Sequence, residues 1–222
     1  MKFKTRLAAI LLMAGSFLFP ARTGWGLDFF DPAIPGALGK MGCSARDLLR
    51  WGDEVPGSCL FTLWAWPAAR QKEAAALALH IRSVNPGLTP RASWRMAGAF
   101  VVASMRFGVP LDLAAAVAQA ESGFNPAAKS RAGATGVMQV RPDVHRDLLA
   151  FRFGAVEPWS LVDPEKAILA GCFLLAGYLR EEKTVERALS RYLGAPDPLY
   201  FERVSRYRTE ITIFLRAWSR YF

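Results

Sequence analysis

The sequence predicts an all-α fold, preceded by an N-terminal extension that is irregular at its start. Apolar residues recur at helical spacing, in segments of ordinary helix length bounded by capping residues and by Gly or Pro. No segment of useful length has the strict alternation that is typical of a half-buried β-strand. The chain has 222 residues, of which 52% are hydrophobic and 21% charged, so it can form a substantial folded core.

The first 26 residues resemble a targeting signal rather than a part of the fold. The basic segment MKFKTR precedes the apolar segment LAAILLMAGSFLF, which is shorter than the roughly 20 residues of a membrane-spanning helix. We interpret residues 1–26 as a signal peptide, cleaved after Gly26 or near Ala21, with an uncleaved anchor as the alternative. Once the signal is removed, we expect no integral membrane span.

Residues 27–88 form the N-terminal extension. Its start contains Pro and Gly pairs that favour irregular structure, whereas the segment AARQKEAAALALHIRSV predicts a helix over 68–84 that ends at Asn85-Pro86-Gly87. Three tryptophans in this region could stack on sugars or pack the extension onto the main domain, and we favour packing: Trp51, Trp64 and Trp66.

Three cysteines and two histidines limit the chemistry of the chain. Cys43 and Cys59 are close enough in sequence to pair as a disulfide in an exported protein, and Cys172 lies in an apolar helical pattern as a buried side chain. The histidines, His80 and His145, pair with no cysteine in a recognisable motif. We therefore expect neither a cysteine nucleophile nor a bound metal.

Residues 89–222 are predicted to be helical throughout. The expected helices start at a capping residue or a Pro and stop at Gly or Pro. We place their starts at Ser93, Asp112, Asp143, Asp163-Pro164-Glu165 and Thr184, with a last helix over about 199–221.

The formal net charge of +9 favours an anionic partner. The basic residues are scattered, without a long basic run or interleaved aromatic residues. We therefore exclude nucleic acid and favour an acidic polymer.

Glu121 stands out as a lone carboxylate at the end of an Ala-rich helix. The carbonyl groups at a helix C-terminus and burial among alanines both disfavour a negative charge. Both effects keep the side chain protonated near neutral pH, as a general acid requires.

The residues around Glu121 resemble a known family signature. The sequence reads ESGFNP at 121–126, GA at 133–134 and GVMQVRP at 136–142. Further likeness lies in FGVP at 107–110, LVDPE at 161–165 and ALSRYLGA at 188–195. This pattern, over roughly 92–210, resembles the soluble lytic transglycosylases (SLT), goose-lysozyme-like enzymes that cleave bacterial peptidoglycan. The resemblance implies a lysozyme-like catalytic domain over 89–222.

The resemblance also implies roles for single residues. Glu121 would protonate the bond between N-acetylmuramic acid and N-acetylglucosamine, then act as base on the muramic C6 hydroxyl to give a 1,6-anhydro end. Ser122 and Gln139 would contact the sugar, Met138 would pack under the sugar or the acid, and Tyr192 would orient Glu121. No cofactor and no metal are implied.

One departure and several alternatives accompany this interpretation. The family usually has an Asn where this chain has Leu193, which places the turn after that helix and some substrate contacts in question. Asp143 or Asp147 on the cleft would instead favour a goose-lysozyme-type hydrolase. A non-catalytic peptidoglycan-binding module of a secretion or conjugation apparatus is a third reading. Resemblance and signal together predict a periplasmic enzyme with peptidoglycan glycan strands as its partner and, as a weaker expectation, a link to secretion, conjugation or flagellar machinery.

Overall fold

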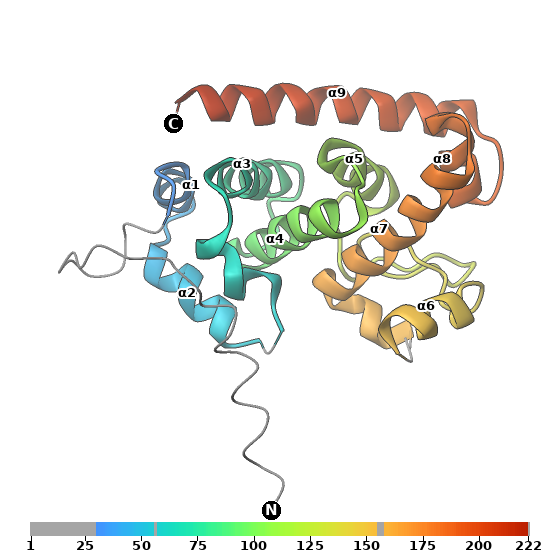
Figure 1. Ribbon diagram of the computed structural model, residues 1–222, viewed down its shortest axis with the longest axis horizontal. Helices are drawn as coiled ribbons and strands as arrows, with labels where there is room; N and C mark the ends of the chain where they lie inside the picture. Colours follow the sequence, from blue (N-terminus) through green and yellow to red (C-terminus); the bar gives the residue numbers. More distant parts are fainter. Residues whose placement is uncertain (1–29, 56, 155–157, 222) are drawn as a thin grey trace, which may run out of the picture.

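The computed structural model describes residues 30–55, 57–154 and 158–221, and these residues confirm the predicted all-α class (Figure 1). Among them there is no β-strand; isolated bridges join Lys129 to Thr135 and Thr135 to Val140. Every described helix is too short or too polar to cross a membrane. The predicted signal, residues 1–26, lies outside the described part of the chain. The helices are α1 Ala33–Lys40, α2 Ala45–Asp53, η2 Cys59–Ala65, α3 Ala68–Val84, α4 Pro90–Phe107, α5 Leu111–Ser122, α6 Arg146–Phe153, η3 Pro158–Val162, α7 Pro164–Glu181, α8 Val185–Leu193 and α9 Pro198–Tyr221.

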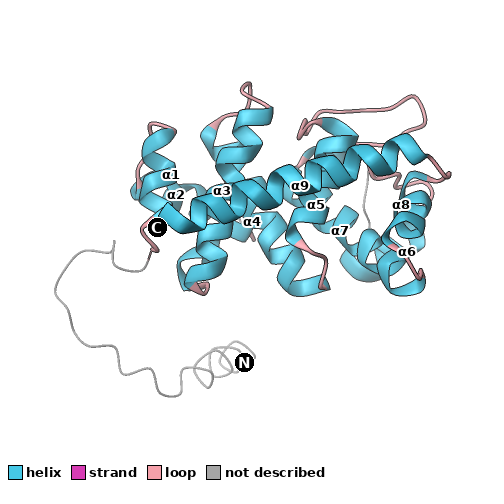
Figure 2. Cartoon of the chain, turned by 90° about the horizontal axis from the view of Figure 1, so that it is seen from above, coloured by secondary structure: helices cyan, strands magenta, loops and turns pink. Residues whose placement is uncertain are grey.

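The central helix is α4, which packs against α3 on one side and α7 on the other. Its side chains Trp94 and Phe100 are fully buried. The long helix α9 packs across both α3 and α5, and the view from above shows it lying over these two helices (Figure 2). The run Ala114–Ala118 in α5 is fully buried, and its small side chains let α5 and α9 approach closely.

Capping chemistry sets most of the helix boundaries. The side chain of Asp163 accepts hydrogen bonds from the first turn of α7, and Thr184 does the same for α8, as predicted. The prediction that Ser93 caps α4 is wrong: Thr89 is the cap, and Pro90 occupies the first helical position. Ser93 is buried one turn later, where its hydroxyl donates to the carbonyl of Pro90.

The extension is more helical at its start than its Pro and Gly content suggested. Helix α1 includes Pro35, which lies in the first helical turn, where a missing N–H group removes no intrahelical hydrogen bond. Helix α2 begins with a capping box between Ser44 and Asp47. Trp51 and Trp66 are buried in the shared core, which confirms packing for these two, whereas Trp64 is 45% exposed.

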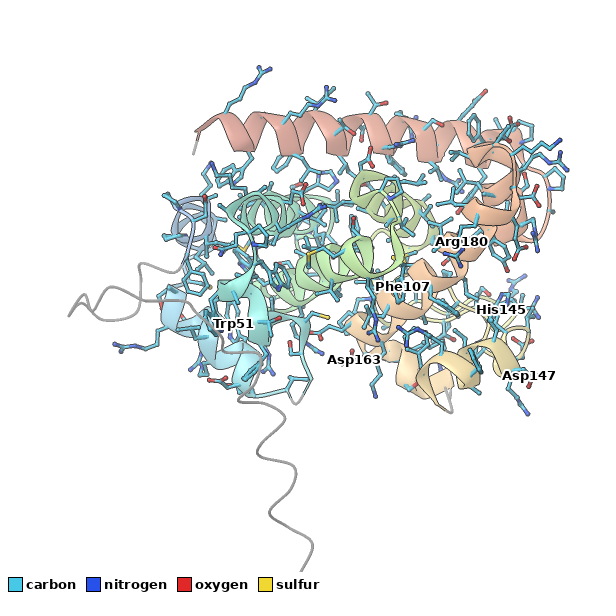
Figure 3. The ribbon with its side chains drawn as sticks, viewed as in Figure 1. Trp51, Phe107, His145, Asp147, Asp163 and Arg180 are labelled. Carbon is cyan, nitrogen blue, oxygen red and sulfur yellow. The ribbon has the colours of Figure 1, made fainter. Side chains whose placement is uncertain are left out.

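A buried charge cluster joins the extension to helices α4 and α7. Glu165, in the first turn of α7, accepts hydrogen bonds from the Ser58 hydroxyl at 2.8 Å and from the Cys59 backbone N–H at 2.9 Å. Arg95 of α4 donates to Glu165 at 2.8 Å and to Asp163 at 2.6 Å. Figure 3 labels Asp163 at the start of α7, on the side of the extension. Because the Glu165 side chain is only 6% exposed, the two regions share one interior.

The expected Cys43–Cys59 disulfide is absent, and both residues are free thiols. The Cys43 thiol donates to the Met41 carbonyl in the turn after α1, whereas Cys59 is buried beside Glu165. Burial and the nearby Glu165 raise the pKa of Cys59 to about 12, which keeps it a thiol. Cys172 is fully buried in α7, as its apolar surroundings predicted.

Candidate active site

Glu121 lies in the last turn of α5, where the helix ends at Gly123 in the left-handed conformation, with φ of 58°. Its side chain reaches the wall of a cavity of about 400 Å³. The loop after α5, the start of α6 and the facing surfaces of α7 and α8 form the rest of the wall. The described lining residues are Glu121, Ser130, Ala132, Ala134, Gln139, Val140, Arg141, Val144, His145, Leu174, Tyr178, Arg191, Tyr192, Leu193 and Gly194.

Tyr200 holds the Glu121 carboxyl group. Its hydroxyl donates to Oε1 of Glu121 at 2.6 Å, from a side chain on the first turn of α9 that is 2% exposed. Burial raises the pKa of Glu121, and the Tyr200 hydrogen bond and the charge of Arg203 offset part of that rise. The carboxyl group therefore has an environment that favours its protonated form and a donor that steadies its ionised form.

Two backbone features shape the loop between α5 and α6. Gly136 has φ of +79°, and a Cβ atom there would lie 2.1 Å from the carbonyl oxygen of Leu161. Only glycine fits this close approach. Gln139 has φ of 48°, which is uncommon for a residue with a side chain. Its amide nitrogen donates to the carbonyls of Ala128 and Gly136, at 3.1 and 3.0 Å, and stabilises this turn.

Ser122 does not occupy the sugar-facing position expected for it. Its hydroxyl donates to the carbonyl of Val137 at 2.7 Å and accepts from the backbone N–H of Asn125 at 3.2 Å. It is absent from the described wall of the cavity. Ser122 therefore fastens the end of α5 to the loop and fixes the position of the neighbouring acid.

Tyr192 does not orient Glu121 directly, which corrects the role expected for it. The hydroxyl of Tyr192 donates to the backbone carbonyl of Met138 at 2.8 Å. Met138 is fully buried, and a Cβ atom on Gly171 would lie 2.5 Å from its Cβ. Met138 thus supports the loop from below, through α7, and the ring of Tyr192 forms part of the cavity wall.

Gln139 lies on the cavity, as expected for a residue that contacts the sugar. Its amide nitrogen is engaged within the loop, while its carbonyl oxygen accepts no hydrogen bond from the described residues. The side-chain oxygen of Gln139 therefore retains its capacity to accept a hydrogen bond.

Asp143 and Asp147 are not among the described residues that line the Glu121 cavity; they line an adjoining hollow at the start of α6, which shares Val144 and His145 with that cavity. Asp143 pairs with Arg141 at 2.8 Å, and that hydrogen bond is the main cause of its lowered pKa. It does not cap α6, because His145 occupies the N-cap position. Figure 3 places Asp147 at the outer edge of the molecule, and His145 nearer to α7 and α8. Among the described residues, no His, Cys, Asp and Glu cluster could hold a metal ion.

Sequence reasoning missed Tyr200, the residue that contacts the acid. It lies 79 positions from Glu121, and only the packing of α9 onto α5 brings the two together. Its position just after Asp197-Pro198 offered a helix start but no indication of a catalytic contact. Arg141 and His145 also line the cavity; both lie in or just after the motif segment, but sequence reasoning assigned neither of them a role in the site.

Comparison with known protein families gives one match, to the transglycosylase SLT domain, over residues 98–210. Comparison with curated proteins and with solved structures gives no match. The matched residues make up just over half of the chain and contain Glu121, its loop, α7, α8 and the first half of α9. The family implies a transglycosylase that binds and cleaves peptidoglycan. On this finding the chain belongs to the transglycosylase SLT domain family.

Proposed function

We propose that the protein is an exported lytic transglycosylase that cleaves the β-1,4 bond between N-acetylmuramic acid and N-acetylglucosamine. The observation that carries this proposal is the single carboxylate of the cavity. Among the described lining residues, Glu121 alone is acidic, and Tyr200 holds it at 2.6 Å.

The proposed reaction begins with proton transfer from Glu121 to the glycosidic oxygen. The bond between this oxygen and the muramic C1 atom breaks, and the N-acetylglucosamine leaves with a free hydroxyl group. The Glu121 carboxylate then takes the proton of the muramic C6 hydroxyl group, and the oxygen of that hydroxyl group forms a bond to C1. The product is a 1,6-anhydro end, and Glu121 is again protonated. Its raised pKa supports the first step, and the hydrogen bond from Tyr200 stabilises the carboxylate that exists between the two steps.

The alternative of a two-carboxylate hydrolase has less support. Such enzymes need a second carboxylate, roughly 5 to 10 Å from the acid, as nucleophile or as base for a water molecule. Asp143 and Asp147, the candidates for that role, are absent from the described lining of the Glu121 cavity and line the adjoining hollow. In the proposed reaction the nucleophile belongs to the substrate, so one carboxylate is sufficient.

Peptidoglycan digestion tests this proposal. The chain without residues 1–26 would be incubated with isolated peptidoglycan, and the soluble products would be identified by mass spectrometry. We expect muropeptides lighter by one water molecule than hydrolytic products, and none from Glu121→Gln. Reducible muramic ends would identify a hydrolase, and binding without any soluble product would favour the non-catalytic module.

Export to the periplasm is proposed from the N-terminal signal alone. Fusing residues 1–30 to a reporter that is active only after export would test it, with the basic MKFKTR segment made neutral as the control. A reporter that stays inactive would contradict the proposed location.

A further inference from the structure

We propose that Arg141 binds a carboxylate of the stem peptide and so makes the enzyme prefer glycan strands that carry peptides. This inference rests on peptidoglycan as the substrate of the proposed function. It concerns the part of the substrate that lies beside the scissile bond, where the described wall of the Glu121 cavity includes the arginines Arg141 and Arg191.

The charge of Arg191 is already compensated within the protein. Its guanidinium contacts Glu181 at 2.5 Å and Glu182 at 3.2 Å, and lies 4.8 Å from the ring centre of Tyr178. Two carboxylates and an aromatic face thus engage this side chain. Arg191 therefore forms part of the cavity wall, but its positive charge is largely neutralised by Glu181 and Glu182.

Arg141 is engaged far less. Its one ion-pair partner among the described residues is Asp143, at 2.8 Å, and the two side chains are 45% and 58% exposed. Ion pairs with such exposure are weak, because water and salt screen them. A guanidinium group has five N–H donors, and this contact uses one of them. Arg141 therefore has donors in the fork geometry that binds a carboxylate.

Two titratable side chains that share the cavity wall with Arg141 are held toward their neutral forms. His145 also lines the cavity; burial lowers its pKa, and the charge of Arg141 lowers it further, against a small opposing effect of Asp143. The imidazole is thereby held toward its neutral form, so it neither attracts nor repels an anion at Arg141. Glu121, the acid on the wall, is held toward its neutral form.

The chemistry of the polymer identifies the anion. Where the lactyl group of muramic acid is joined to peptide, its carboxyl group is an amide, and the sugars of the strand are uncharged. The negative charges then belong to the stem peptide. Arg141 lies on the same cavity as the acid, so a carboxylate bound there belongs to a stem on or next to the sugar being cleaved.

The experiment measures binding without turnover. Glu121→Gln protein would be sedimented with insoluble peptidoglycan whose amino groups are acetylated, and with the same polymer after its carboxyl groups are converted to methylamides. We expect Glu121→Gln protein to bind the polymer with free carboxyl groups about tenfold more tightly than the methylamide form, as one charge-assisted hydrogen-bonded contact allows. Adding Arg141→Gln should remove this difference, and Arg141→Lys should retain part of it.

A matched control separates a specific contact from general charge. Arg131→Gln removes an equal charge from the same loop at an exposed position that does not line the cavity. It should leave the tenfold preference unchanged. Equal effects of Arg131→Gln and Arg141→Gln would overturn the proposal, as would an Arg141→Gln loss that is the same on both polymers.

Peptide-free strands distinguish the two sources of carboxylate. After amidase treatment the strands carry only lactyl carboxylates, and Arg141→Gln should not alter their binding. A loss on these strands would assign Arg141 to the lactyl group and overturn the stem-peptide proposal. If Glu121→Gln protein binds no form of the polymer, peptidoglycan is not the ligand and the proposed function fails as well. If it binds all forms equally, only the proposal for Arg141 fails.

Discussion

Replacing Tyr200 by Phe removes one oxygen atom and the hydrogen bond to the proposed acid. The Tyr200 hydroxyl is 2.6 Å from Oε1 of Glu121, and the side chain is 2% exposed, so water cannot readily replace it. A hydrogen bond to a charged group contributes about 1.5–3 kcal/mol. If the variant loses that contribution in the state of the reaction in which Glu121 is ionised, the rate of cleavage falls by about 10- to 100-fold.

The pH dependence gives a sharper readout than the rate alone. The hydrogen bond from Tyr200 favours the ionised carboxylate, so its removal raises the pKa of Glu121 further. Glu121 must be protonated to act as the acid, and kcat/KM falls as pH rises through its pKa. In Tyr200→Phe the alkaline side of the kcat/KM profile should therefore move to higher pH while the maximum falls.

Tyr207→Phe is the matched control for this measurement. Tyr207 lies on the same helix, half-buried against the core, and no described residue accepts a hydrogen bond from its hydroxyl. We expect its profile to coincide with that of the wild type. An unshifted alkaline limb in Tyr200→Phe, or equal losses in both variants, would refute the role assigned to Tyr200.

Three further predictions concern stability. Glu121→Gln should raise the free energy of unfolding near neutral pH. Folding raises the pKa of the Glu121 carboxyl group, so the wild-type protein loses stability as pH rises through that folded pKa, and Gln removes this loss. Urea titrations should show that the gain vanishes in acid, below the ordinary pKa of Glu. Gly171→Ala should cost roughly 1–3 kcal/mol, because the added Cβ would lie 2.5 Å from Met138, whereas Gly177→Ala on the same helix meets nothing within 4 Å and should stabilise it by about 0.5–1 kcal/mol. Glu165→Ala should cost about 3–5 kcal/mol in a single unfolding transition, and a separate early transition would show that the extension folds independently.

Local signals predicted those parts of the fold that local chemistry decides. The bounds of α3 and the caps of α7 and α8 follow from proline, glycine and capping side chains within a few residues. The Ser93 error has the same origin, since Thr89-Pro90 offered a better start one turn earlier. The disulfide prediction failed because proximity in sequence does not place two thiols in bonding geometry.

The candidate site could be predicted only in part, for a physical reason. The motif located Glu121 and the loop that lines the cavity, because both lie within one continuous segment. The partners of the acid depend on how helices far apart in sequence pack together. Tyr200 reaches Glu121 across the α5–α9 contact, whereas Ser122, its direct neighbour in sequence, turns away to the Val137 carbonyl.

Because α9 supplies the hydrogen bond to Glu121, Leu193 in α8 is compatible with an intact acid. Helix α8 ends at Leu193, and Gly194 in the left-handed conformation, with φ of 94°, supplies the turn that follows. The missing Asn is therefore not needed to end the helix. Leu193 lies on the cavity wall, where the change replaces an amide by an apolar surface. Glu121 takes its hydrogen bond from α9 and not from α8, so this substitution alters what the cavity can bind while the geometry of the acid is preserved.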